Sequence, residues 1–509
     1  MKRISIILLC LVMALPALSR PRRDSLSVVE RVARADDALT SIGEAAYDGS
    51  VAASAYRRKV SLSSLAIGYD LRREQEAMLQ AEGDGLSAGR FNAESYMHLN
   101  EHSTVEASAS YFRGVKRNVR WNSSSDYSLL WPYIGADSIG GDLSSEQYMF
   151  GGSYAHRAER FAYGVGASYR AMHEFRRVDP RPRNITSDLQ AQLSGGYNFS
   201  SYHLGAAIGV RVYSQEHSVD YFSMAGANTS QLPMTGLGTY YDRFAGSSSD
   251  YTNYEFDGVG YNISLQLVPT QSEGWRAVVG YKSLSIKRLL PQINNTPLTK
   301  LIVDELSASV AFRSEGSRIR WAVGAEGRYE IRRGEENLLN TGSLSSNIVL
   351  ATFTMYECHT AEAAITGGVE FVRDWGYLFL RPRVELLSVD AGYRYPERRM
   401  EFATADGALD IGARYVSDKW LIDAEIGGGY VVGLSHSLFM PADTEKAMRE
   451  MVSSQCANFA SDRLHLGVKV SAQRSLNSRL ALFLSGAWQM YERNSLMGNV
   501  AQIEAGIRF

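Results

Sequence analysis

The chain has 509 residues, of which 45% are apolar and 21% are charged. This balance excludes a disordered chain and, with a mean hydropathy of −0.20, a bundle of membrane-spanning helices. The net charge of −2 shows no sign of the basic surface that nucleic-acid binding requires, so we expect no nucleic acid among the partners. Glycine (45) and tyrosine (29) are abundant, and large membrane barrels use them for strand bends and interfacial girdles.

The first 19 residues have the pattern of a signal peptide. Lys2 and Arg3 precede an apolar run from Ile4 to Leu15, which is too short to span a bilayer, and Ala17-Leu18-Ser19 provides a cleavage site with small residues. Beyond them, no run approaches the roughly 18 apolar residues of a spanning helix. We therefore expect export without a helical anchor.

Residues 20–58 form an N-terminal segment in which 25–39 is predicted to be a short helix, with Val28, Val29 and Val32 on one stripe. The segment is too short for the plug domain of an actively driven receptor. Two interpretations stay open: the segment enters a barrel as a small plug, or it forms a helix in the periplasm.

Residues 59–509 alternate between apolar and polar or small side chains, which is typical of strands. One segment places Val259, Tyr261, Ile263 and Leu265 on one face and Gly260, Asn262, Ser264 and Gln266 on the other. Such segments run for about 10–14 residues, whereas a tilted strand that crosses lipid needs about 9–11. Their length favours strands that cross a membrane over those of a soluble sandwich.

The connections between these strands alternate in length. Short turns, such as Ser200-Ser201, alternate with long connections at 117–145, 214–254, 332–358 and 434–461. Outer-membrane barrels have short periplasmic turns and long outer loops. The sequence therefore predicts an all-β fold: a single transmembrane antiparallel β-barrel of about 18 strands (range 14–18), which begins near Val60, in the outer membrane of a Gram-negative bacterium.

The last strand ends on an aromatic residue after alternating apolar positions, among them Ile503 and Ile507 before Phe509. This pattern resembles the C-terminal signal by which bacterial barrels are recognised for insertion. We therefore expect the barrel-assembly machinery to be a partner.

Two loop motifs support a family resemblance. The first combines Trp121-Asn122, Asp126-Tyr127, the run from Leu130 to Asp137, Gly140-Gly141-Asp142 and Glu146-Gln147-Tyr148; the second combines Tyr169-Arg170 with the run from Asp179 to Asn184. With them the chain resembles a Bacteroidota family of outer-membrane β-barrels of unknown function, over essentially the whole mature chain. The resemblance implies location and fold, and no functional residue.

Two groups of loop residues are candidate contact sites. A basic cluster, formed by Arg176, Arg177, Arg181 and Arg183, either attracts an anion such as the phosphate of surface lipopolysaccharide or is an ordinary solvated loop. The aromatic residues Trp131, Tyr133, Tyr240 and Tyr241 either stack on sugars and partner proteins or are buried as loops fold over one another.

Cys358 and Cys456 both fall in predicted outer loops, so we predict a disulfide between them. The nine histidines are scattered, with no HExxH or GxSxG motif. We therefore expect no enzyme, cofactor or metal site.

Two functions remain. A barrel of this size leaves an aqueous lumen, which indicates a passive channel or transporter for small solutes. Alternatively, a non-conducting barrel acts as a scaffold for a secretion, assembly or surface-glycan partner. In both cases outer-membrane lipid surrounds the barrel.

Overall fold

The computed structural model describes residues 26–222, 231–246, 252–340 and 348–509, so the predicted signal peptide lies outside the described residues. Within these ranges, 18 long strands pair into one sheet. They are β1 (Leu62–Glu74), β2 (Gly85–His98), β3 (Ser103–Val119), β5 (Gly141–Arg157), β6 (Phe161–Phe175), β7 (Arg181–Phe199), β8 (Tyr202–Asp220), β11 (Tyr254–Pro269), β12 (Gly274–Leu290), β13 (Thr296–Glu315), β14 (Ile319–Leu339), β15 (Val349–Arg373), β16 (Gly376–Tyr393), β17 (Arg398–Val416), β18 (Trp420–Phe439), β19 (Arg463–Asn477), β20 (Leu480–Arg493) and β21 (Leu496–Arg508).

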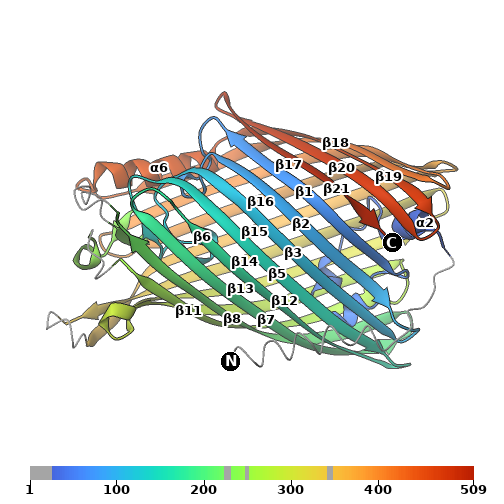
Figure 1. Ribbon diagram of the computed structural model, residues 1–509, viewed down its shortest axis with the longest axis horizontal. Coiled ribbons are helices and arrows are strands. Elements are labelled where there is room, and N and C mark those ends of the chain that lie inside the picture. The colour runs from blue at the N-terminus through green and yellow to red at the C-terminus, as the bar shows by residue number, and fades with distance from the viewer. Residues whose placement is uncertain (1–25, 223–230, 247–251, 341–347) are drawn as a thin grey trace.

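Each strand pairs antiparallel with its neighbour in the chain, and β1 pairs with β21 from Ser64↔Arg508 to Glu74↔Gly498. This pairing closes the sheet, so the barrel has no open edge (Figure 1). Closure is required in a bilayer because no water there can satisfy the hydrogen bonds of an exposed strand edge. The predicted class and strand number are confirmed.

The period-two pattern sorts side chains between lipid and lumen. On β11, Val259, Tyr261 and Ile263 are exposed on the outside, whereas Ser264 and Gln266 face inward and are buried. Aromatic side chains form two outward-facing groups. Tyr69, Tyr148, Tyr169, Tyr281 and Tyr329 lie about eight to eleven residues along their strands from the short turns, and Phe161, Trp275, Trp321, Phe371 and Trp420 lie within the first three. Such girdles mark the two surfaces of a membrane.

The short turns gather at one end of the barrel and the longer connections at the other. From the orientation that the sequence predicts, they are here called the periplasmic end and the outer end. Several predicted loops are shorter than expected because the strands continue past the lipid. The clearest case is 332–358, since β14 runs to Leu339 and β15 begins at Val349. Among the described residues, no helix is both long and apolar enough to cross a membrane.

The remaining elements fill the two ends of the barrel. Residues 27–61, here called the lumen segment, contain α2 (Val28–Ala35), α3 (Ala45–Asp48) and α4 (Val51–Ser54). At the outer end, α5 (Tyr127–Leu130), β4 (Gly135–Ala136), β9 (Leu232–Gly236), β10 (Thr239–Tyr240) and α6 (Lys446–Ala460) belong to three connections that pack on one another, here called the outer cap. Three 3₁₀ turns complete the described part of the chain: η2 (Gln80–Glu82), η3 (Asp242–Phe244) and η4 (Pro291–Ile293).

Candidate functional site

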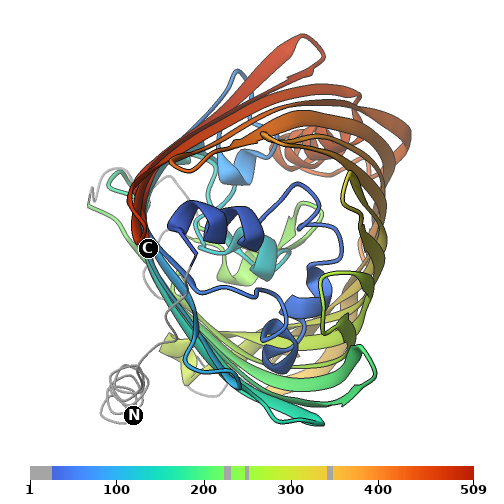
Figure 2. The ribbon, with the colours of Figure 1, turned by 90° about the vertical axis from the view of Figure 1, so that its right-hand side faces the viewer.

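The lumen segment lies inside the periplasmic end of the barrel. Figure 2, a view from that end, shows its helices within the ring of strands. The segment enters beside the turn between β19 and β20, where the Val28 amide donates to the Ser478 carbonyl at 3.0 Å. It leaves directly into β1. Of the two interpretations of residues 20–58, the structure therefore has the segment inside the lumen.

Helix α2 begins with a capping box, in which Ser27 accepts from the Glu30 amide and Glu30 accepts from the Ser27 amide. Each bond satisfies an amide that the first helical turn leaves unpaired. Val29 and Val32 are buried against Leu421 of β18. The apolar stripe that predicted this helix is thus its contact with the barrel wall.

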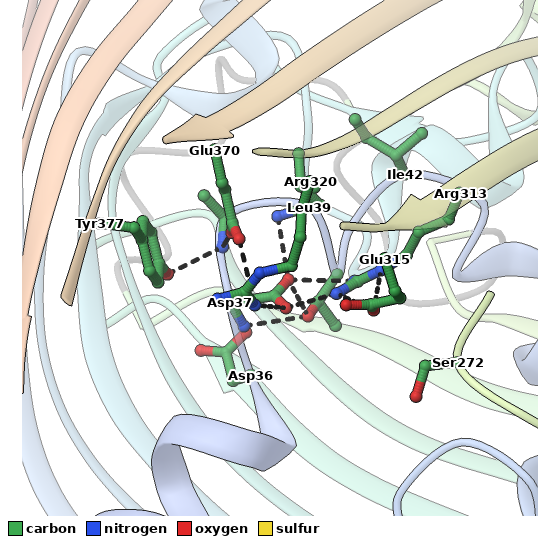
Figure 3. A network of polar contacts seen from close by, with 12 residues as sticks. Asp36, Asp37, Leu39, Ile42, Ser272, Arg313, Glu315, Arg320, Glu370 and Tyr377 are labelled. Carbon is green, nitrogen blue, oxygen red and sulfur yellow. Dashed lines mark hydrogen bonds and ion pairs between the residues drawn. The ribbon is translucent and has the colours of Figure 1, made fainter. Parts of the chain in front are cut away.

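A charged network holds the chain just after α2 (Figure 3). Arg313 of β13 donates two parallel hydrogen bonds to the Asp37 carboxylate, at 3.0 and 2.5 Å. Arg320 of β14 lies 3.6 Å from the same carboxylate and 3.3 Å from Glu370 of β15. The two side chains of the first pair are about one-tenth exposed, so solvent screens this ion pair little.

Asp37 also shapes its own turn. Its Oδ1 atom accepts from the Leu39 amide at 3.0 Å and from the Thr40 hydroxyl at 2.9 Å. Burial alone would raise the pKa of Asp37, but the hydrogen bonds and positive charge of Arg313 outweigh it and hold that pKa below its ordinary value of 3.8. The carboxylate is therefore ionised throughout the neutral range.

The next residue, Ala38, is fixed through its backbone. Its amide donates to Glu370 at 2.9 Å and to the Tyr377 hydroxyl at 3.0 Å, and its carbonyl accepts from Arg381 at 3.1 Å. Arg414 reaches the Asp36 carbonyl in the same way. Strands β15 to β17 thus satisfy the polar backbone of a stretch that has no secondary structure to do so.

Beyond the network, apolar side chains dock where the wall is made of small residues. Leu39 and Ile42 are buried against Ala311 and Ala322. A Cβ atom at Gly368 would lie 2.5 Å from Leu39 Cδ2 and 2.9 Å from Ile42 Cδ1. The wall therefore has a hollow that fits these two side chains, and any side chain at Gly368 would displace them.

The amino end of α4 docks on the opposite wall. The amides of Val51 and Ala52 donate to Gln192 and Ser194 of β7 at 3.1 and 2.9 Å. A Cβ atom at Gly164 would lie 2.6 Å from Val51 Cγ1. The lumen segment therefore bridges the barrel from β6 and β7 to the strands of the charged network.

Between the lumen segment and the barrel wall lies a water-accessible cavity of about 1120 Å³, here called the chamber. Its wall is mostly serine, glycine, glutamine and asparagine from β3 to β13, including Ser108, Gln190 and Asn262. Among the described residues, no three His, Cys, Asp or Glu side chains gather where they could share a metal ion.

The outer cap buries the aromatic residues that the sequence singled out. Tyr133 is buried and directs its hydroxyl to Glu336 at 3.4 Å, and the Arg288 guanidinium lies 5.6 Å from its ring. Trp131, Tyr240 and Tyr241 pack against the same apolar cluster. Of the two interpretations, the structure has the loops folded over one another.

The basic cluster is not brought together. Arg176 is buried and paired with Asp137 at 2.9 Å, whereas Arg181 pairs with Asp179 at 2.7 Å. Arg177 and Arg183 are exposed. One arginine therefore belongs to the interior and the others to the surface, as in an ordinary loop.

The predicted disulfide is wrong: Cys358 and Cys456 are both free and buried. Cys358 is not in a loop, because β15 begins nine residues earlier and turns this side chain toward the lumen. Cys456 lies on α6, 3.9 Å from the Glu401 carbonyl. Burial raises the pKa of the Cys456 thiol.

The predicted insertion-signal residues lie on the closing strand. Ile503 is exposed on its lipid face, and Ile507 is half-buried. The Phe509 amide and carbonyl both bond to the backbone of Ser63, at 3.0 and 2.9 Å.

The residues that the sequence missed are Asp37 and its partners. Several of these partners are charges at lumen positions beside the short turns, a placement that indicates contact with something inside the barrel.

A closed sheet with an apolar outer belt and a polar lumen defines a transmembrane β-barrel. The chain belongs to a family of unknown function (DUF6850), whose model matches residues 50–509. A comparison with curated proteins finds no match.

Among solved structures, a mutant ferric enterobactin receptor from Pseudomonas aeruginosa is similar at 6% identity, over 88% of this chain and 80% of its own, with a TM-score of 0.39. The ferric-catecholate import receptor Fiu from Escherichia coli K12 has 8% identity, coverage of 88% and 81%, and a TM-score of 0.39. The outer membrane transporter YddB from Escherichia coli has 8% identity, coverage of 88% and 81%, and a TM-score of 0.40.

Proposed function

We propose that this protein is a transporter for small hydrophilic solutes in the outer membrane of a Gram-negative bacterium, closed at rest by the lumen segment. The observation that carries the proposal is the polar chamber of about 1120 Å³ beside that segment. A barrel that served only as an anchor would have no need of a polar space at its centre, since a barrel of about eight strands, whose side chains fill the interior, would suffice.

The contacts of the lumen segment support a gate that can move. It is held by ion pairs and hydrogen bonds to side chains, such as those of Arg313 and Gln192, and no strand of the barrel includes it. Its release therefore leaves the backbone pairing of the barrel intact. The occupied lumen favours such a gated barrel over a permanently open pore.

The same proposal includes the membrane lipid around the barrel, the machinery that inserts it and the group of bacteria to which it belongs. The two aromatic girdles lie against outer-membrane lipid, with lipopolysaccharide on the outer side. Insertion by the barrel-assembly machinery uses the strand that ends at Phe509. The two loop motifs support an origin in Bacteroidota.

Conductance in planar bilayers tests the gate. Gly368→Val places a side chain in the hollow that holds Leu39 and Ile42, and overpacking of this kind costs about 1–3 kcal/mol. Gly367→Val is the matched control, because the neighbouring residue faces away and its Cβ atom would lie 3.6 Å from Pro382.

We expect the unaltered protein and Gly367→Val to be closed most of the time, and Gly368→Val to conduct in discrete steps. Deletion of residues 27–58 should give the largest steps. Because the outer cap still covers the other end, a variant that lacks both residues 27–58 and α6, folds and stays electrically silent would refute transport and favour the scaffold.

A further inference from the structure

The chamber differs from the rest of the lumen in its chemistry. Uncharged polar side chains line it from several strands, among them Ser108, Ser153, Gln190, Gln192, Asn262 and Ser264. In the described part of the chain, 13 serine, glutamine and asparagine residues line it, against four acidic and five basic residues. A solute inside it therefore meets mostly hydroxyl and amide groups.

Three of the five bases that line the chamber are paired with carboxylates. Lys282 lies 3.1 Å from Glu305, and Arg211 lies 2.8 Å from Asp188. Arg57 contacts Asp48. Because each of these three bases contacts a carboxylate, an anionic solute could use none of them without first breaking an ion pair. Within the described residues, the lining groups without an ion pair are two bases, Arg58 and Arg508, and two acids, Glu94 and Glu106, so their charges balance.

The opposite wall of the lumen, on β14 to β18, also carries paired charges, and it has more of them. Arg381 bridges Asp410 and Glu425 at 3.0 and 2.9 Å, and Arg328 pairs with Glu362. Pairs of this kind cancel each other's field beyond a few ångströms. Neither wall therefore favours a cation or an anion over the full width of the lumen.

The size of the chamber bounds the solute. Binding sites of about 300–1,000 Å³ enclose ligands of drug size. A cavity of about 1120 Å³ has room for a molecule of two or three sugar units or amino acids together with some water.

We propose that the solute is uncharged and rich in hydrogen-bonding groups, of the chemical class of a short neutral oligosaccharide. This inference rests on the proposed function and names the solute class of the same lumen. Hydroxyl groups of such a solute would exchange hydrogen bonds with the serine, glutamine and asparagine side chains of the wall. An ionic solute would leave its water shell for a wall whose few charges without an ion pair are of both signs and equal in number, so neither sign of solute is compensated.

Solute entry into proteoliposomes tests the class. In proteoliposomes that hold the Gly368→Val protein, the rates of entry of three trisaccharides are compared: maltotriose, which is neutral, the anionic trigalacturonate and the cationic chitosan trimer. Gly368 is outside the chamber lining, so the variant keeps the side chains that the strands contribute to the wall, such as Gln190 and Asn262, while those of the lumen segment move with it. We expect maltotriose to enter severalfold faster than either charged trimer.

A charge placed in the chamber should then reverse this order. Gln190→Glu with Asn262→Asp keeps the size of both side chains and should raise entry of the cationic trimer relative to maltotriose by about fivefold, as one charge pair about 4 Å apart in water would. Gln502→Glu, on β21 and outside the chamber lining, is the control and should have little effect.

The outcomes separate the two proposals. Entry of a charged trimer as fast as maltotriose, in a variant that conducts, overturns the solute class and leaves the transporter standing. Entry of none of the three, in a folded protein that is electrically silent, overturns both.

Discussion

Substitution of Asp37 by asparagine should loosen the lumen segment by a predictable amount. The change removes the charge that Arg313 and Arg320 share but keeps the shape and the acceptor oxygen of the side chain. Hydrogen bonds to charged groups contribute about 1.5–3 kcal/mol, and Glu315 remains as a partner of Arg313 at 2.7 Å. We therefore expect a loss of about 2 kcal/mol in docking free energy, which is about a 30-fold rise in the undocked fraction.

The labelling rate of a buried thiol measures that fraction. Ser54→Cys places a near-isosteric thiol on α4, where the serine is 6% exposed, in a background with Cys358 and Cys456 replaced by serine. With a bulky maleimide added from the periplasmic side, Asp37→Asn should raise the labelling rate about 30-fold when opening is fast and rare.

Asp406→Asn is the matched control, because Asp406 also carries a lumen charge but pairs with His465 at 3.0 Å, away from the segment. A labelling rate that Asp37→Asn leaves unchanged would refute the role of the charged network. An equal rise in the control would show that any loss of lumen charge suffices.

Three further predictions concern other parts of the molecule. Because the pKa of Asp37 lies below 3.8, its contribution to docking is complete above that pH and is lost as the pH falls further. A nitroxide spin label at residue 54 should therefore keep the same mobility from pH 7 to 5 and gain mobility below pH 3.8. In Asp37→Asn this gain of mobility at low pH should be absent. Cys358 and Cys456 should both be alkylated after denaturation without reductant, and both should react slowly in the native protein. A denatured protein that takes up no alkylating reagent, with a mass two hydrogens below that of the dithiol form, would show that the disulfide exists after all. Phe509→Ala should lower the amount of folded barrel in the membrane severalfold, whereas Phe439→Ala, at an exposed strand end, should not; equal amounts would contradict the insertion signal.

The barrel could be predicted because its pattern is local. Alternation such as that from Val259 to Gln266 reports the two faces of one strand, and turn spacing then fixes the number of strands. Closure needed no further information, since an open edge is excluded in lipid.

The contents of the lumen could not be predicted in the same way. Asp37 and Arg313 are 276 residues apart, and nothing near either residue indicates the other. The cysteine pair failed for a related reason: an even count shows that a bond is chemically permitted, whereas only the position of β15 shows that Cys358 turns toward the lumen. For residues 20–58 the sequence permitted both a plug in the lumen and a helix in the periplasm, and it contained nothing that would choose between them.

The position of the lumen segment beside the barrel seam bears on how the protein is assembled. The segment continues into β1, and β1 completes the cylinder only when it pairs with β21, at the far end of the chain. The contacts of residues 36–52 lie on β6 and β7 and on β11 to β17, away from that seam. If the seam forms last, filling and closure are one event: the segment settles on a sheet that is still open, and the seam then closes over it. A variant whose segment cannot dock would close around an empty lumen, so the gate would be lost without any fault in the cylinder.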